Sequence, residues 1–167
     1  MGMFIVSTLM ILALIFPFFI ASIIKKTDQN KIQKIVTREI LHYGLEIKEK
    51  ELWRNNFIGI DPAKKKLLYI KADNPKYILE LIELTDLIEC RIISQIKRNK
   101  NHNTYEETLE RLGLELTRIH PNDPISFLGF YSSEETALES YEIPRAEKWN
   151  KLINKYIPLK TGYKKAS

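Results

Sequence analysis

The sequence contains little of what catalytic and metal sites are usually built from. Its 167 residues include one cysteine and three histidines. A single cysteine excludes an internal disulfide and agrees with a reducing compartment. No HExxH motif and no paired Cys/His spacing points to zinc. We therefore predict no metal site and no cofactor.

The few reactive side chains are isolated from one another. His42 ends a predicted helix, His102 lies in a polar stretch, and His120 opens a turn. Cys90 alternates with charged neighbours on a predicted core face, so we interpret it as a buried thiol. A nucleophile would need an adjacent base and a lowered pKa.

The common catalytic motifs are also missing. The chain has no GxGxxG, no P-loop and no GxSxG elbow. Glu106, Glu107 and Glu110 form an acidic cluster, which an exposed loop or short helix explains better than paired catalytic carboxylates. We predict no catalytic residue. The competing hypothesis is an enzyme whose site is assembled only in three dimensions.

One long hydrophobic run stands out in the chain. Met3–Ile24 contains 22 residues without a charged side chain. A helix of that length extends about 33 Å, enough to cross a hydrocarbon core of about 30 Å. A cleaved signal peptide fits less well, because no Lys or Arg precedes the run and no clear small-x-small site follows it. A buried core helix fits poorly, because the run is apolar on every side. We predict a transmembrane anchor over residues 1–26.

Basic residues follow the run and none precedes it. Lys25 and Lys26 come directly after it, and Lys31 and Lys34 come soon afterwards. The positive-inside rule then places the C-terminal part in the cytoplasm. The sequence predicts a single-pass protein of the inner (cytoplasmic) membrane.

Residues 27–44 are predicted to form an amphipathic connecting segment, whose helix ends just before Gly44. The helix either continues the membrane helix or packs on the domain. Its apolar positions recur at three- and four-residue steps: Ile32, Ile35, Val36, Ile40 and Tyr43.

From residue 45 onward the hydrophobic period changes to two. Residues alternate between two faces over Phe57–Ile60 and Leu67–Ile70, and Asp61-Pro62 is a turn signal between them. Phe57–Ala72 is therefore predicted to be a strand, a tight turn and a strand. Tyr77–Arg98 is compatible with a helix, but its alternation favours two strands broken near Thr85-Asp86.

The second half contains a loop, a hairpin and a helix. Residues 97–107 are polar without an apolar period, which predicts a loop. Residues 112–120 and 125–133 form a predicted second hairpin joined by turn residues. Residues 143–157 form a predicted amphipathic helix, and residues 158–167 a basic polar tail. The helical stripe consists of Ala146, Trp149, Ile153 and Tyr156.

These antiparallel strands, closed by a C-terminal helix that carries a tryptophan, resemble a pleckstrin-homology-like roll. The residues behind the resemblance are Trp53, the hairpin IGID…KKKLLYI, the segment LTDLIECRII, the second hairpin and AEKWNKLI. The chain also looks like small membrane-anchored hypothetical proteins of bacteria. The resemblance implies an α+β fold, with an antiparallel roll over residues 45–157 closed by the last helix. It carries over no catalytic residue, because such modules are generally binding scaffolds. The helix before the first strand departs from the simple pattern.

The net charge of +5 is spread over several lysine groups. Lys64, Lys65 and Lys66 are interpreted first as charges that keep a hairpin tip soluble and discourage edge pairing. The alternative is a contact with the membrane surface or an acidic partner, which the lysines after the anchor would share. Nucleic-acid binding is disfavoured, because it would be better supported by aromatic residues interleaved with the basic ones on one strand face.

The sequence as a whole predicts a non-enzymatic, membrane-tethered cytoplasmic interaction module, such as an accessory subunit of a membrane complex. The expected partners are the lipid bilayer and another membrane protein. An anionic-lipid-binding module is a further alternative, beside the enzyme named above.

Overall fold

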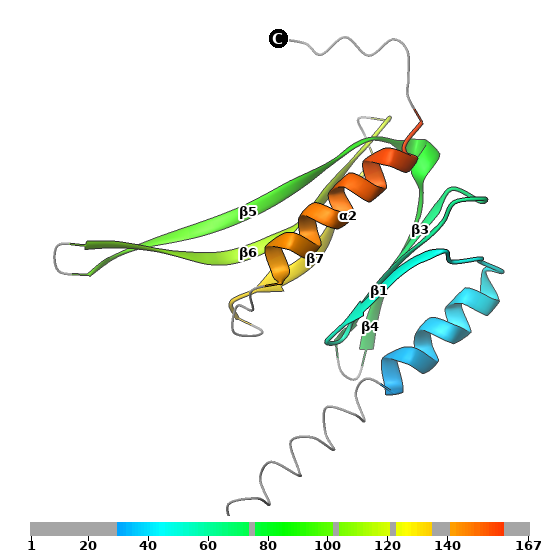
Figure 1. Ribbon diagram of the computed structural model, residues 1–167, viewed down its shortest axis with the longest axis horizontal. Coiled ribbons are helices and arrows are strands. Elements are labelled where there is room, and N and C mark those ends of the chain that lie inside the picture. Colours follow the sequence, from blue (N-terminus) through cyan, green and yellow to red (C-terminus); the bar gives the residue numbers. More distant parts are fainter. Residues whose placement is uncertain (1–29, 74–75, 102–103, 121–122, 135–140, 159–167) are drawn as a thin grey trace, which may run out of the picture.

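The protein has an α+β fold with two antiparallel sheets and two helices (Figure 1). The computed structural model describes residues 30–73, 76–101, 104–120, 123–134 and 141–158. The predicted α+β class is therefore confirmed. Within these ranges, no helix is long and apolar enough to cross a membrane. The predicted anchor, Met3–Ile24, and the basic tail lie outside the described residues.

The first sheet is a four-stranded meander. Its strands, in the order β1-β2-β3-β4, are Glu49–Trp53, Asn56–Asp61, Lys66–Asp73 and Lys76–Glu83. The strand, tight turn and strand predicted over Phe57–Ala72 are confirmed as the β2–β3 pair. The chain also reverses at Arg54-Asn55, where Trp53 pairs with Asn56. Arg54 has a φ of 48°, the left-handed conformation that tight hairpin turns require.

The second sheet has three strands in the order β5-β6-β7. Its strands are Leu87–Asn101, Thr104–Arg118 and Ser126–Ser132. A single 3-10 turn, Leu84–Asp86, separates the two sheets, so the predicted break near Thr85-Asp86 is confirmed. The predicted hairpin of the second half is confirmed as the β6–β7 pair.

The loop predicted over residues 97–107 was wrong. These residues belong to β5 and β6, where Lys97 lies opposite Thr108 and Arg98 opposite Glu107. Arg98 Nε lies 2.7 Å from Glu107 Oε1. The described side chains of these residues are exposed on both faces of the two strands. Residues that lie opposite each other are therefore polar, and the sequence has no apolar period here.

The outer part of this hairpin projects from the body as an arm (Figure 1). The last residue pair between β6 and β7 is Arg111 with Ser132. Beyond it, β5 and β6 have only each other as strand neighbours. We define the hairpin arm as residues 96–101 and 104–109.

The main core lies between the two sheets and the C-terminal helix α2, Glu142–Tyr156. The predicted stripe is confirmed, because Ala146, Trp149 and Ile153 are fully buried and Tyr156 packs against them. The helix contacts all three strands of the second sheet. The first sheet faces the same core with alternate residues, which include Ile58, Ile60, Leu67 and Tyr69.

The N-terminal helix, residues 30–42 of the described chain, covers the opposite face of the first sheet (Figure 1). Ile32 and Val36 pack there against Phe57, Leu68 and Ile70. The helix therefore packs on the domain, which was one of the two predicted outcomes. Gly44 follows its end with a φ of 58°, as its position predicted.

Ion pairs attach α2 to the first sheet. Glu51 of β1 accepts hydrogen bonds from Arg145 Nε (2.7 Å), Lys148 Nζ (2.9 Å) and Trp149 Nε1 (2.8 Å). Glu142 is fully buried but lies 3.0 Å from Arg54 and 2.9 Å from Arg145. Burying these carboxylates is tolerated because each faces cations and hydrogen-bond donors.

Replacing Trp149 by Ala should lower the free energy of unfolding by about 3–5 kcal/mol, because it leaves a large cavity in the core. Lys151→Ala, on the exposed side of α2, should change it by less than about 0.5 kcal/mol. Urea unfolding followed by circular dichroism measures both. An unchanged midpoint for Trp149→Ala would contradict a core position.

Acid should weaken the Glu51 contact. Burial raises the pKa of this carboxyl, but hydrogen bonds from Lys148, Arg145 and Trp149 outweigh burial and hold the pKa below its ordinary value of 4.5. A carboxyl whose pKa is lower in the folded state stabilises the fold fully at a pH above its unfolded-state pKa. This stabilisation is lost as the pH falls through the folded-state pKa. The stability difference between wild type and Glu51→Gln should therefore narrow as the pH falls below 4.5. A constant difference in urea unfolding would contradict the ionic contact.

Candidate functional site

The predicted contact lysines do not share one environment. Lys31 and Lys34 are exposed on the N-terminal helix, while Lys64, Lys65 and Lys66 lie at the β2–β3 turn beside the other end of that helix. About ten residues of largely helical chain, or roughly 15 Å, separate Lys34 from Gly44 at that end. Lys25 and Lys26 lie outside the described residues.

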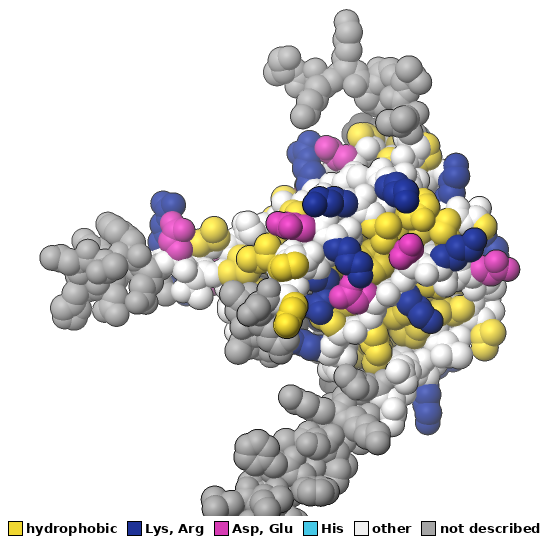
Figure 2. Space-filling view, viewed as in Figure 1, with side chains coloured by type: hydrophobic (Ala, Val, Ile, Leu, Met, Phe, Trp, Pro, Cys, Tyr) yellow, Lys and Arg dark blue, Asp and Glu magenta, His cyan; other side chains and the backbone are white. Residues whose placement is uncertain are grey.

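Two of the three lysines at the turn have local partners. Lys64 Nζ donates to the Gly44 carbonyl at 2.6 Å, which ties the turn to the end of the N-terminal helix. Lys66 Nζ lies 2.9 Å from Glu83 Oε1 in β4. Lys65 is exposed and has a φ of 52°. In Figure 2, basic side chains are interspersed with acidic and apolar ones on the visible face.

Asp61 organises the same turn. Its carboxylate accepts from the backbone N–H groups of Lys64 (2.9 Å) and Glu46 (2.8 Å). Burial raises the pKa of Asp61, but backbone hydrogen bonds, with that of Lys64 first, outweigh burial and lower it. The Asp-Pro signal in the sequence therefore marks a structural carboxylate that fixes the turn.

Cys90 is buried, as predicted, and its surroundings disfavour the thiolate. Burial raises the pKa of the thiol to about 12, against a smaller opposing effect of Asn150. The Cys90 carbonyl accepts from Asn150 Nδ2 (2.7 Å) and Asn154 Nδ2 (2.8 Å), and its N–H donates to Asn154 Oδ1 (3.0 Å). These α2 side chains therefore cap the free edge of β5 at this point.

The acidic cluster predicted from the sequence lies in one strand, and Glu107 and Glu110 have different surroundings there. The interpretation as a loop or short helix was wrong, because all three glutamates lie in β6. Glu107 pairs with Arg98, whereas Glu110 lines a pocket. Of the histidines, His42 and His120 are exposed and His102 lies outside the described residues. Across the described ranges, no group of three or more His, Cys, Asp or Glu residues is placed to hold a metal ion.

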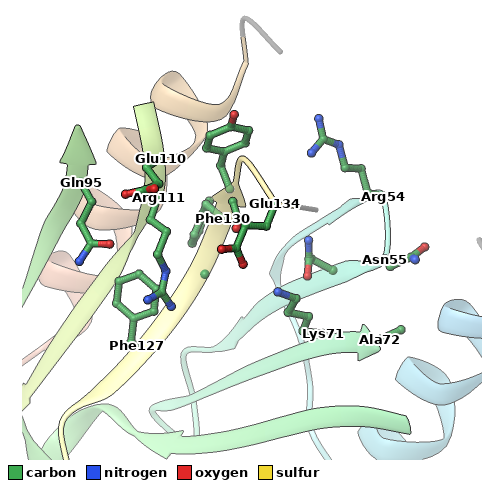
Figure 3. A pocket seen from close by; sticks show the side chains of 14 residues that line it. Arg54, Asn55, Lys71, Ala72, Gln95, Glu110, Arg111, Phe127, Phe130 and Glu134 are labelled. Carbon is green, nitrogen blue, oxygen red and sulfur yellow. The ribbon is translucent and has the colours of Figure 1, made fainter. Parts of the chain in front are cut away.

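The residues around this pocket come from both sheets. The β1–β2 turn and the end of β3 form one wall, and β5, β6 and β7 form the other (Figure 3). Its volume of about 660 Å³ is within the range of small-molecule sites. We call it the intersheet pocket.

Charged side chains of both signs line the intersheet pocket. Lys71 and Arg111 point from opposite walls toward the space between them, and Glu134 lies between them in the view of Figure 3. The Arg111 guanidinium lies 5.0 Å from the centre of the Phe127 ring. A Cβ at Gly113 would clash with the Phe127 ring, so the glycine makes room for the ring.

Asn56 is the most informative residue of this pocket. It is only 9% exposed, and its side chain faces the inner side of the first sheet together with Ile58 and Ile60. Its cross-strand neighbour is Lys71. Among the described residues, four buried side-chain atoms lack a hydrogen-bond partner, and Asn56 Oδ1 is the one whose residue lines the intersheet pocket.

Sequence reasoning did not find the intersheet pocket. Its residues come from five strands of two sheets, and no spacing along the chain brings them together. The one local signal is the tract Arg54–Asn56, which interrupts the alternation of apolar residues. No family model, no curated protein and no solved structure matches this chain.

The reactivity of Cys90 with a thiol reagent tests whether its side chain is buried and protonated. With a pKa of about 12, about one Cys90 side chain in ten thousand is a thiolate at pH 8, and burial shields it as well. The native protein should not react with Ellman's reagent over minutes, whereas protein unfolded in guanidinium should release about one equivalent. Rapid reaction of the native protein would contradict a structural role.

Proposed function

We propose that the protein is a membrane-tethered, non-enzymatic interaction module that docks through the root of its hairpin arm. The observation that carries this proposal is an apolar strand face that continues beyond the core. Along β5, Cys90 is buried, whereas Ile92 and Ile96 on the same face are 39% and 55% exposed.

The surface around these residues favours docking. Figure 2 shows apolar side chains where the arm joins the body, beside the start of α2. Ile143 at that start is also half exposed. Apolar side chains that gather on a surface with a polar surround are typical of protein contacts. A two-stranded ribbon is marginal alone, so a partner would also stabilise the arm.

The tether rests on the hydrophobic run in the sequence. Five residues separate Ile24 from Asn30, where the described N-terminal helix begins. That helix packs on the first sheet, so the proposed anchor would hold the domain near the bilayer. Its cytoplasmic orientation follows from the lysines after the run.

We also propose that the fold is of the pleckstrin-homology-like type. A four-stranded and a three-stranded antiparallel sheet, closed by a C-terminal helix, support this assignment. An interaction role accords with such scaffolds, although the fold alone does not define function.

A photo-crosslinking residue at position 96 tests the docking proposal in full-length protein with a tag after Ser167. Irradiated cells should give a protein adduct in the membrane fraction, whereas the probe at Lys151 on the exposed side of α2 should give none. Ile92→Ser should reduce the adduct at position 96. In intact spheroplasts, external protease should leave the tag uncleaved.

Three outcomes of these experiments would contradict the proposal. A protein found wholly in the soluble fraction would contradict the tether, and a tag cleaved from outside would contradict the orientation. The absence of an adduct from position 96, or equal adducts from both positions, would contradict docking through this surface.

A further inference from the structure

We propose that the protein forms a symmetric dimer in which the β4 strands of two copies pair edge to edge. This surface is separate from the root of the hairpin arm, so the inference goes beyond the docking function. It combines an edge strand whose backbone is left open, outward backbone groups on apolar residues, and a charge pattern that complements its own reverse.

The other sheet edges are occupied by side chains, whereas that of β4 is open. Side chains of α2 bind Glu51 at β1 and the backbone of Cys90 at β5. At β7, the Gly129 carbonyl accepts a hydrogen bond from the Tyr69 hydroxyl. Among the described residues, only β3 hydrogen-bonds to the backbone of β4, and the two strands pair without a bulge (Figure 1). Flat, apolar edges of this kind pair readily with other strands.

The phase of the β3–β4 ladder shows which groups face this edge. The Leu84 N–H donates to the Lys65 carbonyl at 2.8 Å, in line with the register of the two strands. Hydrogen-bonded pairs alternate with non-bonded pairs in an antiparallel ladder, so the even-numbered residues of β4 bond to β3. The N–H and C=O groups of Tyr77, Leu79 and Leu81 therefore point outward.

The beginning of β4 is its accessible half. Lys76, Tyr77 and Ile78 are exposed, and Ile78 is 51% exposed, whereas Ile82 is buried in the main core. A pairing centred on Ile78 uses this half of the strand. Ile78 then lies opposite its own counterpart on the two-fold axis, and Tyr77 lies opposite Leu79 of the second copy, where outward backbone groups meet.

The same register pairs opposite charges. Lys76 of each copy lies opposite Glu80 of the other, at positions without hydrogen bonds between the copies, where Cα atoms are about 4.5 Å apart. Neither side chain forms an ion pair within the described part of the chain. A shift of two residues in either direction would place Lys76 opposite Ile82 or Ile78 instead.

The symmetry of this pairing suits a tethered protein, a step that rests on the proposed anchor. Opposite residues of an antiparallel pair share a face, so the two-fold axis is normal to the joined sheet. Both N-terminal helices therefore cover the same face, and two anchors could enter one membrane. A contact of this isologous kind also closes the assembly at two copies.

Disulfide crosslinking of the full-length protein in detergent micelles tests the register. With oxidised glutathione, Ile78→Cys should form a disulfide-linked dimer at least tenfold faster than Lys151→Cys, because the two introduced thiols face each other. Lys151 is exposed on α2 and serves as the matched control, while wild type reports on the buried Cys90 alone. Equal rates at positions 78 and 151 would overturn the proposal.

A backbone variant tests the edge itself. Light scattering should give twice the mass of one chain for wild type. Leu79→Pro removes an outward N–H but no bond to β3, so it should fold and be monomeric. Leu79→Ala shortens the same side chain but keeps the N–H, so it should remain dimeric. A monomeric wild type, or a dimeric and folded proline variant, would overturn pairing through β4.

Exchange of the charges keeps the proposal testable even if the proline variant does not fold. Glu80→Lys should raise the dissociation constant of the dimer about tenfold or more, because it places like charges opposite each other twice. Adding Lys76→Glu should restore the wild-type value. An unchanged dissociation constant for Glu80→Lys, or no recovery in the double variant, would overturn the register.

Discussion

The contact between Trp149 and Glu51 is the point on which the two-sheet structure depends. Helix α2 packs on the strands of the second sheet, while Glu51 belongs to β1 of the first. The indole thus fills the shared core and, through Nε1, hydrogen-bonds the far sheet. Tyr69 makes a second link, because its hydroxyl donates to the Gly129 carbonyl of β7 at 2.7 Å. Along the chain, only the short turn at Leu84–Asp86 joins the sheets, so side chains must hold them together.

The first sheet has apolar partners on both faces, and this explains its sequence. Successive residues of β3, such as Leu67 and Leu68, face different clusters, the core on one side and the N-terminal helix on the other. Strands buried on both faces are nearly continuous in apolar residues. The N-terminal helix is thereby part of the domain rather than a loose linker. Ile32 and Val36 connect this helix to β2 and β3.

The sequence predicted those helices and strands whose buried residues recur at a regular spacing along a short stretch of chain. The stripe of α2, including Trp149, and the break near Thr85-Asp86 can be read along the chain because burial repeats at helical or strand spacing. The arm could not be read in this way, because Arg98 and Glu107 stabilise it across strands and leave no apolar period. The intersheet pocket was harder still to predict, because the residues that surround Asn56 in it are distant in the sequence. The lysines Lys64 and Lys66 were located correctly at a turn, but their partners depend on tertiary structure.

The free edge of β5 is protected in different ways near Cys90 and in the hairpin arm. This protection limits the kinds of contact that the arm can make. At Cys90, Asn150 and Asn154 occupy the backbone groups to which an added strand would bind. Farther out, charged side chains such as Arg98 lie on the ribbon, and charge on an edge opposes strand addition. Pairing of another strand to β5 is therefore disfavoured along much of its described length. Ile96, two residues before Arg98 on the same side-chain face, is an exposed apolar residue. A partner is thus expected to pack on that face, with specificity set by side-chain shape rather than by added backbone hydrogen bonds.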